Sequence, residues 1–228
     1  DELTGKILEY PINQLYKQSI DEKINILELD NGQTIRITKN HHLLTEIGWS
    51  NNFDQCQYVA IPTIIKNDLC RSSIGKDLAY FLSWQLSIGN EYTIQNSLSI
   101  ASTDSNLLND LFKSFKIVAN QYNFNVDQLD ILYPQNQSPY LQLCSKDYTE
   151  FLEKNGYVWG NLSTQKSIPQ ILIGANLTEI KIFLQTYFDL ESLIDIKKST
   201  IEISSYSRQL MIQLQHLFKL FGINMTFK

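Results

Sequence analysis

Two apolar segments with helical spacing, about 100 residues apart, constrain this chain more than any other feature. The first runs from Ile74 and is expected to stop at Gly89, and the second opens at Leu177-Thr178. Their apolar positions are Leu78, Phe81, Leu82 and Leu86 in the first, with Gln85 on the same face, and Ile180, Phe183, Leu184, Tyr187 and Phe188 in the second. Because each segment is followed by a strand and another helix, the sequence predicts two similar halves related by pseudo-twofold symmetry.

The elements that follow the two apolar helices can be located from their patterns. In the first half, residues 93–101 alternate as a strand, and Thr103-Asp104 is suited to cap a helix that continues to Phe115. In the second half, residues 200–203 form the expected strand, and residues 206–221 form an amphipathic helix that ends at Gly222. The order helix, strand, helix therefore occurs twice.

The first 65 or so residues have a different pattern. Residues 24–38 alternate apolar and polar side chains on both sides of Asn31-Gly32, which is typical of a β-hairpin. Gly48-Trp49 is expected to form another turn, and residues 57–62 are expected to form a short strand ended by proline. A change in composition at residues 63–73 marks the boundary between this β-rich region and the helical remainder.

Bulk composition is that of a folded protein without a membrane segment. The 43% of hydrophobic residues in 228 can form a sizeable core, and no apolar run reaches the ~20 residues that cross a bilayer. We expect a soluble intracellular protein, cytoplasmic or organellar, with no membrane partner. Three separated cysteines, and three histidines of which none lies four residues from another or near a cysteine cluster, do not predict a structural metal site, although carboxylates could still hold a catalytic Mg²⁺.

The charge balance limits what a nucleic-acid partner could contribute. The net charge is −5, and by count residues 1–68 have 6 Lys and Arg against 10 Asp and Glu, while residues 69–228 have 13 against 14. Proteins that bind DNA normally have a basic surface that releases counterions from phosphates. Any DNA affinity should therefore depend on local clusters, and non-specific binding should be weak.

One motif lies in the β-rich region. A hydroxyl and an imidazole three residues apart, Thr38 and His41, follow a strand and could act on one peptide bond. With Gly48-Trp49 and the strand of residues 58–62, this stretch resembles the Thr-x-x-His block of intein splicing domains. The resemblance implies that His41 promotes the acyl shift at the N-terminal splice junction, and that the partners are host-protein exteins or a complementary C-terminal splicing fragment. The alternative is a surface turn with chance histidines.

The two apolar helices carry the second resemblance. Residues 81–89 and 184–192 are similar to degenerate LAGLIDADG motifs of homing endonucleases. In that family the motif helices pack together, and the eighth position holds an acid that shares divalent metal and faces double-stranded DNA. Here the eighth positions are Ile88 and Glu191, so one acid is lost and Glu191 is the expected metal ligand. Mg²⁺ is the implied cofactor if cleavage occurs, since the metal activates water and neutralises the leaving oxygen.

Two further residues extend this resemblance. Residues 166–169, Lys-Ser-Ile-Pro, are similar to the Lys-x-Ile-Pro signature found between the motif helices, which implies that Lys166 stabilises charge near the scissile phosphate. Glu91 follows Ile88 by three residues and is an alternative acid if the register shifts. The alternative interpretation is that the two motif segments are ordinary amphipathic core helices and that Lys166 is a solvent-exposed charge without a catalytic role.

Departures from both families shape the expected activity. The chain begins with Asp1 instead of a nucleophilic Cys or Ser, and residues 224–228 lack a terminal His-Asn pair. We expect no complete splicing by this chain alone, either because it is a fragment or because the activity is lost. Ile88 in place of an acid predicts little or no double-strand cleavage.

The sequence therefore predicts an α+β protein with a partial Hint-type splicing region at residues 1–66 and a LAGLIDADG endonuclease-like domain at residues 67–228, built from two αββαββα-like halves whose sheets form a DNA saddle. Two other functions stay open. One is a non-catalytic DNA-binding module on the same scaffold, like the bacterial regulator WhiA. The other is an interaction or structural module without DNA, which suits the acidic balance.

Overall fold

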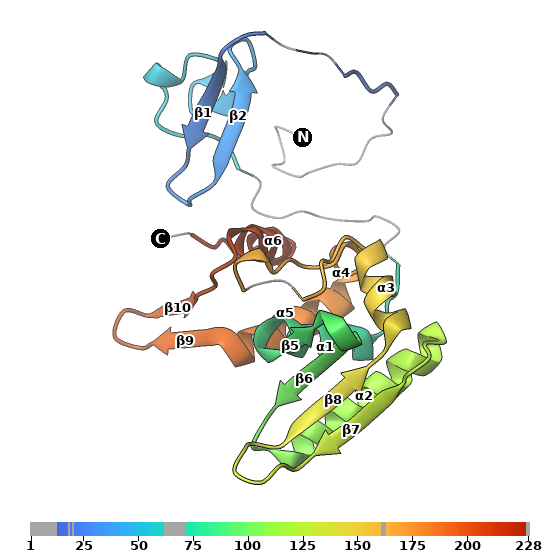
Figure 1. Ribbon diagram of the computed structural model, residues 1–228. Helices are drawn as coiled ribbons and strands as arrows, with labels where there is room; N and C mark the ends of the chain where they lie inside the picture. The colour runs from blue at the N-terminus through green and yellow to red at the C-terminus, as the bar shows by residue number, and fades with distance from the viewer. Residues whose placement is uncertain (1–12, 18, 20, 62–71, 161–162, 227–228) are drawn as a thin grey trace. The chain divides into compact units, whose positions relative to one another are not determined.

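The computed structural model describes residues 13–17, 19, 21–61, 72–160 and 163–226 (Figure 1). The chain divides into two compact units, one formed by residues 1–69 and 218–228 and the other by residues 70–217. Unit 1 and unit 2 are each described by themselves. Among the described residues, no helix combines the length and the apolar character that crossing a bilayer requires.

Unit 1 contains the expected hairpin. β1 (Ile24–Glu28) pairs antiparallel with β2 (Thr34–Thr38), in a register that places Ile24 opposite Thr38. The connection turns at Gly32, which has a φ of +77° and donates its amide to the Leu29 carbonyl at 2.8 Å. A residue with a side chain would be strained at this φ. The hairpin turn that Asn31-Gly32 predicted is therefore confirmed, and the positive φ explains the need for glycine.

The next hairpin of unit 1 differs in detail from the expectation. β3 (Leu43–Thr45) pairs with β4 (Gly48–Ser50), so the turn lies at residues 46–47 and Gly48-Trp49 belongs to a strand. The short 3₁₀ helix η1 (Phe53–Gln55) follows. Only a single bridge, Val59 to Thr45, forms where a strand over residues 57–62 was expected, and Pro62 lies outside the described residues.

Unit 2 is organised around two helices, α1 (Lys76–Ile88) and α5 (Leu177–Glu191), which pack against each other (Figure 1). Both helices are confirmed close to their expected bounds. An isolated parallel bridge joins Ser72 to Ala175, just before each helix begins. The two helices therefore start from the same level and run in the same direction.

A four-stranded antiparallel sheet lies beside α1, in the order β5-β6-β8-β7. Its strands are β5 (Asn90–Tyr92), β6 (Ser97–Ala101), β7 (Gln128–Leu132) and β8 (Tyr140–Cys144). The stretch expected as one strand over residues 93–101 begins instead with a 3₁₀ turn, η2 (Thr93–Gln95). Alternation along β6 and β8 sends Leu98, Ile100, Leu141 and Leu143 into the core, each at most 1% exposed.

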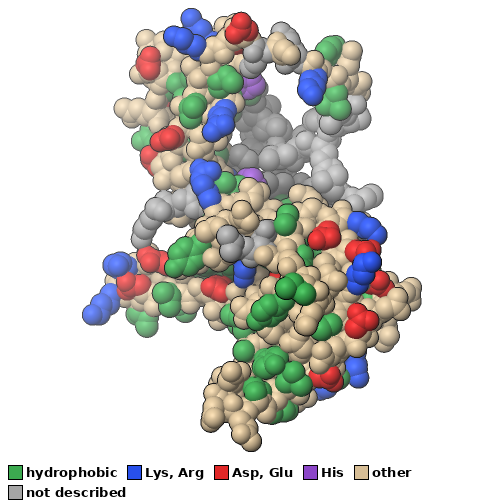
Figure 2. Space-filling view, viewed as in Figure 1, with side chains coloured by type: hydrophobic (Ala, Val, Ile, Leu, Met, Phe, Trp, Pro, Cys, Tyr) green, Lys and Arg blue, Asp and Glu red, His purple; other side chains and the backbone are tan. Residues whose placement is uncertain are grey.

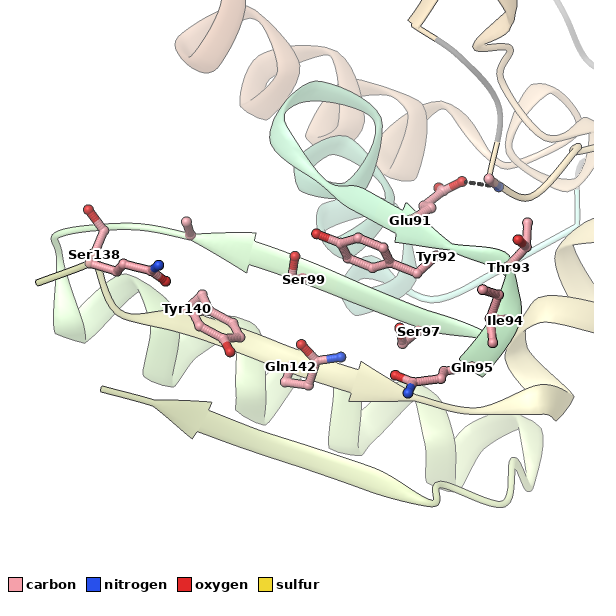
Figure 3. A pocket seen from close by; sticks show the side chains of 13 residues that line it. Glu91, Tyr92, Thr93, Ile94, Gln95, Ser97, Ser99, Ser138, Tyr140 and Gln142 are labelled. Carbon is pink, nitrogen blue, oxygen red and sulfur yellow. Dashed lines mark hydrogen bonds between the residues drawn. The ribbon is translucent and has the colours of Figure 1, made fainter. Parts of the chain in front are cut away.

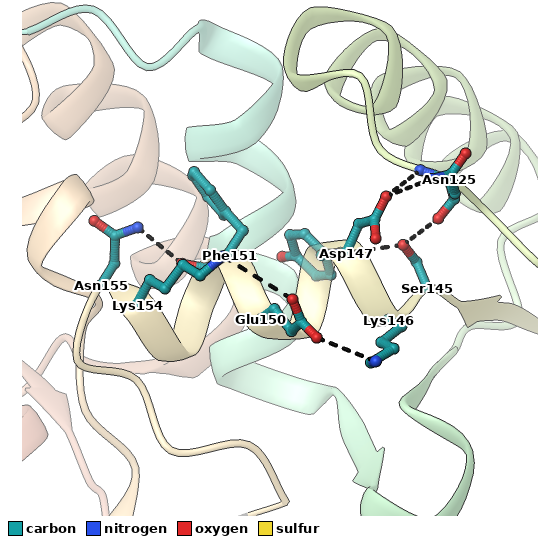
Figure 4. Close-up of polar contacts among 9 residues, drawn as sticks. Asn125, Ser145, Lys146, Asp147, Glu150, Phe151, Lys154 and Asn155 are labelled. Atoms are coloured by element: carbon teal, nitrogen blue, oxygen red, sulfur yellow. Dashed lines mark hydrogen bonds and ion pairs between the residues drawn. The ribbon is translucent and has the colours of Figure 1, made fainter.

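Two helices complete the first half. α2 (Ser105–Tyr122) begins where Asp104 accepts the amides of Asn106 and Leu107, as the sequence predicted, and packs on the sheet. α3 (Lys146–Lys154) follows β8 and is capped by Ser145. Figure 4 shows Asp147 accepting the backbone and side-chain amides of Asn125, both at 2.8 Å, which ties α3 to the end of α2. The first half is therefore helix, two strands, helix, two strands, helix.

The second half has fewer elements among the described residues. A short η3 (Ser163–Gln165) and α4 (Gln170–Ile173) lead to α5, and α5 leads to the two-stranded sheet β9 (Ser192–Asp195) and β10 (Thr200–Ile203). α6 (Arg208–Lys219) follows, and residues 220–226 contain no helix or strand. The expectation of two complete αββαββα halves is thus met by the first half, whereas the second shows αββα.

Candidate nucleic-acid interface and helix-end cluster

The N-terminal ends of α1 and α5 are joined by a buried carboxylate. Glu179 of α5 is 3% exposed and accepts the Ser73 hydroxyl at 2.6 Å and the amides of Ile74 and Gly75 at 2.9 Å. These amides lie just before α1, at a helix end where N–H groups lack partners within the helix and favour negative charge. Burial raises the pKa of Glu179, but these hydrogen bonds more than offset it and leave the pKa below its ordinary value.

The C-terminal ends of the same helices meet at the two motif positions. Ile88 ends α1 and is 38% exposed, while Glu191 ends α5. The Ser87 hydroxyl donates to Oε1 of Glu191 across the helix pair. Gly89 follows Ile88, and any Cβ there would approach the Gln85 carbonyl oxygen to 2.5 Å. The structure therefore brings the two predicted eighth positions together, with one carboxylate between them.

Lys166 lies at this same place. Its Nζ donates to the carbonyl oxygens of Leu86 at 2.9 Å and Ser87 at 3.3 Å. Burial lowers the pKa of Lys166, and the charges of Glu91 and Glu191 raise it in part. We call Ser87, Ile88, Lys166 and Glu191 the helix-end cluster. Three residues predicted from separate motifs therefore meet in it, and Ser87, which the sequence did not single out, connects them.

Glu91, the alternative acid, faces the core side of the sheet. It pairs in register with the buried Leu98. Its Oε1 accepts the Gln85 amide at 2.7 Å and the Tyr157 hydroxyl at 2.5 Å, and its Oε2 accepts the Gly160 amide at 2.8 Å. Burial and the charge of Glu91 raise the pKa of Tyr157, which keeps its hydroxyl as a donor. Both carboxylate oxygens of Glu91 are thus engaged in holding β5 to its surroundings.

The opposite face of the four-stranded sheet is polar. Cross-strand register puts one set of side chains on the side turned away from α2, and Figure 3 shows several of them beside a groove of about 820 Å³. We use the name groove face for six members of this set: Tyr92, Ser97, Ser99, Tyr140 and Gln142, which line the groove, and Asp130, which the register places beside Gln142. Ser97 is only 1% exposed. The alternation of serines with Leu98 and Ile100 in the sequence indicates a polar side of β6. The residues of β8 that lie beside these serines are known only from the strand register.

Charge on unit 2 is dispersed. Among the described residues, no Lys or Arg lines the groove. Glu91 lines it at one edge with its carboxylate bonded to Gln85, Tyr157 and Gly160, and the register of β7 with β8 places Asp130 on the groove side of the sheet. Figure 2 shows basic side chains in separate places, with acidic ones between them, on the visible face. Several lysines of unit 2 form exposed ion pairs, such as Lys198 with Asp195 at 3.2 Å and Lys146 with Glu150 at 3.4 Å. The groove face therefore offers hydrogen-bonding groups without positive charge.

In unit 1, Thr38 is the last residue of β2 and His41 follows it by three residues. The His41 amide donates to the Thr38 carbonyl at 3.1 Å, which closes a turn, and the His41 side chain is exposed. The two residues are thus adjacent, as their spacing requires. Their predicted role in splicing stays a prediction.

Metal-ligating side chains are sparse in the described parts of the chain. Among them, no group of three or more His, Cys, Asp or Glu residues could hold a metal ion. The described cysteines, Cys56 and Cys144, are free thiols. Glu191 is the one carboxylate of the helix-end cluster.

One family model matches this chain. Residues 178–228 match the model described as a LAGLIDADG-like domain. The matched segment contains nearly all of α5 together with β9, β10 and α6. The motif helix that carries Glu191 is therefore the one that the family model includes.

Several solved structures are similar to this chain. I-DmoI crystallised with DNA and Mn is 14% identical, with a TM-score of 0.46 over 67% of this chain and 81% of that chain. A crystal structure of I-DmoI with DNA and Ca is 15% identical, with a TM-score of 0.47 over 67% of this chain and 75% of that chain. Full-length DUF199/WhiA from Thermotoga maritima is 9% identical, with a TM-score of 0.41 over 69% of this chain and 48% of that chain.

Proposed function

We propose that unit 2 is a LAGLIDADG-type module that binds double-stranded DNA through its groove face and cleaves it poorly or not at all. The observation that carries this proposal is the polar side of the β5-β6-β8-β7 sheet. Sheets and β-ribbons can enter the major groove of DNA, where each base pair displays a distinct set of donors and acceptors. The groove face presents such groups from neighbouring strands.

Gln142 is suited to reading a base. It lies in the middle of β8, between Ser99 of β6 and Asp130 of β7 in the cross-strand register. A glutamine amide can bond bidentately to the N6 and N7 atoms of adenine, and a carboxylate such as Asp130 can accept from cytosine N4. This row of three side chains supports recognition by hydrogen bonds to base edges.

Electrostatics then predict an unusual salt response. Each phosphate neutralised by a Lys or Arg contributes about 0.9 to the slope of log K against log salt. Since the groove lining contains no Lys or Arg, few phosphates can be neutralised there. Binding should therefore be weak on random DNA, with a shallow dependence on salt.

Impaired cleavage follows from the helix-end cluster. Phosphodiester hydrolysis at such a site requires carboxylates that hold the metal and activate water. Ile88 supplies an apolar group at one of the two positions, and Glu191 alone remains. Residues that act as one unit lose most of their activity together, so the loss of one ligand is expected to remove efficient cutting.

Binding can be tested with the full chain. Duplexes enriched from a randomised library would be titrated at several salt concentrations, beside random duplexes. Gln142→Ala should weaken binding to the enriched duplex by about 1–3 kcal/mol. Asn109→Ala, an exposed amide on α2, is the matched control and should have no effect. No enrichment and no binding at low salt would instead favour an interaction module without a DNA partner.

We further propose that residues 1–66 derive from the splicing domain of an intein, and that residues 67–228 form the endonuclease-like domain. The Thr38–His41 turn directly after a β-hairpin supports the first assignment. Residues 1–12, 18, 20 and 62–66 lie outside the described part. The gene sequence around the chain tests the proposal: a Cys or Ser codon upstream and a His-Asn pair downstream are expected, and continuous unrelated coding sequence would contradict it.

A further inference from the structure

Lys166 occupies the position at the helix ends where a cation is required. The last four carbonyl groups of an α-helix have no partner within the helix and bear partial negative charge. At the end of α1, the Leu86 and Ser87 carbonyls both accept from the Lys166 ammonium, at 2.9 and 3.3 Å. Glu191, which bonds to the Ser87 hydroxyl, adds a full negative charge nearby.

The position of Lys166 is fixed by its own backbone. Its carbonyl accepts the hydroxyl of the buried Ser207 at 2.5 Å. Two residues later, Gln213 of α6 bonds to both the amide and the carbonyl of Ile168, at 2.7 and 3.1 Å. These contacts fix the backbone of the segment, so that the Lys166 side chain reaches the end of α1. Lys166 is therefore not simply a solvent-exposed lysine, which was the alternative left open by the sequence.

The donor set here does not fit a divalent metal. Mg²⁺ and Mn²⁺ favour several oxygen ligands, usually including more than one carboxylate in such sites. Ile88 provides none, one oxygen of Glu191 already accepts from Ser87, and both oxygens of Glu91 accept other donors. The helix-end carbonyls accept from an ammonium that would repel a metal ion.

We propose that the Lys166 ammonium is the resident cation of the helix-end cluster, so that this chain joins its two central helices and binds its ligand without a divalent metal. Only the statement about ligand binding rests on the proposed DNA function. The statement about the helices concerns the protein alone and can be tested without DNA.

The test compares Mn²⁺ binding and thermal unfolding of the full chain. For the wild type, we expect no Mn²⁺ binding by calorimetry at millimolar metal and the same Tm in Mn²⁺ as in EDTA. Lys166→Met should lower the Tm by about 3–8 °C because two carbonyls lose their partner. Lys166→Arg keeps a cation and should recover part of that loss. Lys181→Met, an exposed lysine on α5, is the matched control and should leave the Tm unchanged.

A double variant separates cation replacement from a merely structural role. Ile88→Asp with Lys166→Met restores a second carboxylate and removes the ammonium, so it should show Mn²⁺ binding by calorimetry under the conditions in which the wild type shows none, and its Tm should rise when Mn²⁺ is added. Stoichiometric Mn²⁺ binding by the wild type, or an unchanged Tm in Lys166→Met, would overturn the proposal. Failure of DNA binding with these results intact would overturn only the proposed function.

Discussion

The two central helices of unit 2 begin alike and end differently. Their starts are joined by the Ser72–Ala175 bridge and by Glu179 of α5, which accepts the amides of Ile74 and Gly75 just before α1. At their ends, α5 finishes with a carboxylate, whereas α1 finishes with Ile88 and has its carbonyls held by Lys166. The contrast teaches that the packing of the pair and the chemistry at its ends depend on different residues, so either can change while the other persists.

The shared start should produce the largest effect on stability. Glu179→Ala would leave the buried amide of Ile74, the half-buried amide of Gly75 and the Ser73 hydroxyl without this acceptor, and should lower the free energy of unfolding by about 2–4 kcal/mol. Denaturant unfolding measures this change. Glu150→Ala on α3 removes only exposed ion pairs with Lys146 and Lys154 and should change stability by about 0.5 kcal/mol or less. Equal effects of the two variants would contradict the assigned role of Glu179.

Glu179 also predicts a pH dependence. Its folded-state pKa lies below the ordinary value of 4.5, so the unfolded chain takes up the proton first as the pH falls. The contribution of Glu179 is therefore complete above pH 4.5 and is lost as the pH drops through the folded-state pKa. Glu179→Gln should flatten this acid limb in unfolding measurements, and an unchanged slope would show that other groups cause it.

A smaller effect is expected midway along the helices. Ser83 is fully buried and donates its hydroxyl to the Tyr80 carbonyl at 2.6 Å, whereas Thr186, the corresponding small residue of α5, is half-buried. Ser83→Leu should cost about 1–3 kcal/mol through overpacking, and Thr186→Leu should cost less. Thermal unfolding of both variants would compare the two positions, and the reverse ranking would contradict the more complete burial of Ser83.

The smallest effects should come from the unlike ends. Glu191→Ala removes the acceptor of the Ser87 hydroxyl and should lower the free energy of unfolding by about 1 kcal/mol. Ile88→Ala truncates a partly exposed side chain and should lower it by less than about 1 kcal/mol. Calorimetry can rank them. A large loss from Ile88→Ala would mean that this isoleucine supports packing, contrary to its exposure.

Local patterns predicted much of this fold. The bounds of α1 and α5 followed from apolar spacing and from Gly89, and Asp104 marked the start of α2 because capping is a local interaction. The order helix, strand, helix in the first half followed as well, whereas β5, β7 and β8 were expected only through the αββαββα halves that the family resemblance implied. Elements that depend on one or two neighbouring residues are those that a sequence specifies most directly.

Long-range pairing accounts for what the sequence did not predict. The role of Glu91 depends on Tyr157 and Gly160, which lie 66 and 69 residues away, and Lys166 meets Leu86 across 80 residues. The groove face required the register of β6 with β8. Such contacts arise from tertiary packing, and no local spacing encodes them.

Enrichment of duplex DNA by the full chain in EDTA, followed by addition of Mg²⁺ to the selected duplex, tests the central claim most directly. We predict a reproducible enriched sequence, bound with a shallow salt dependence and left uncut when Mg²⁺ is added. Absence of enrichment, or efficient double-strand cleavage of the selected duplex in Mg²⁺, would contradict a metal-independent DNA-binding module.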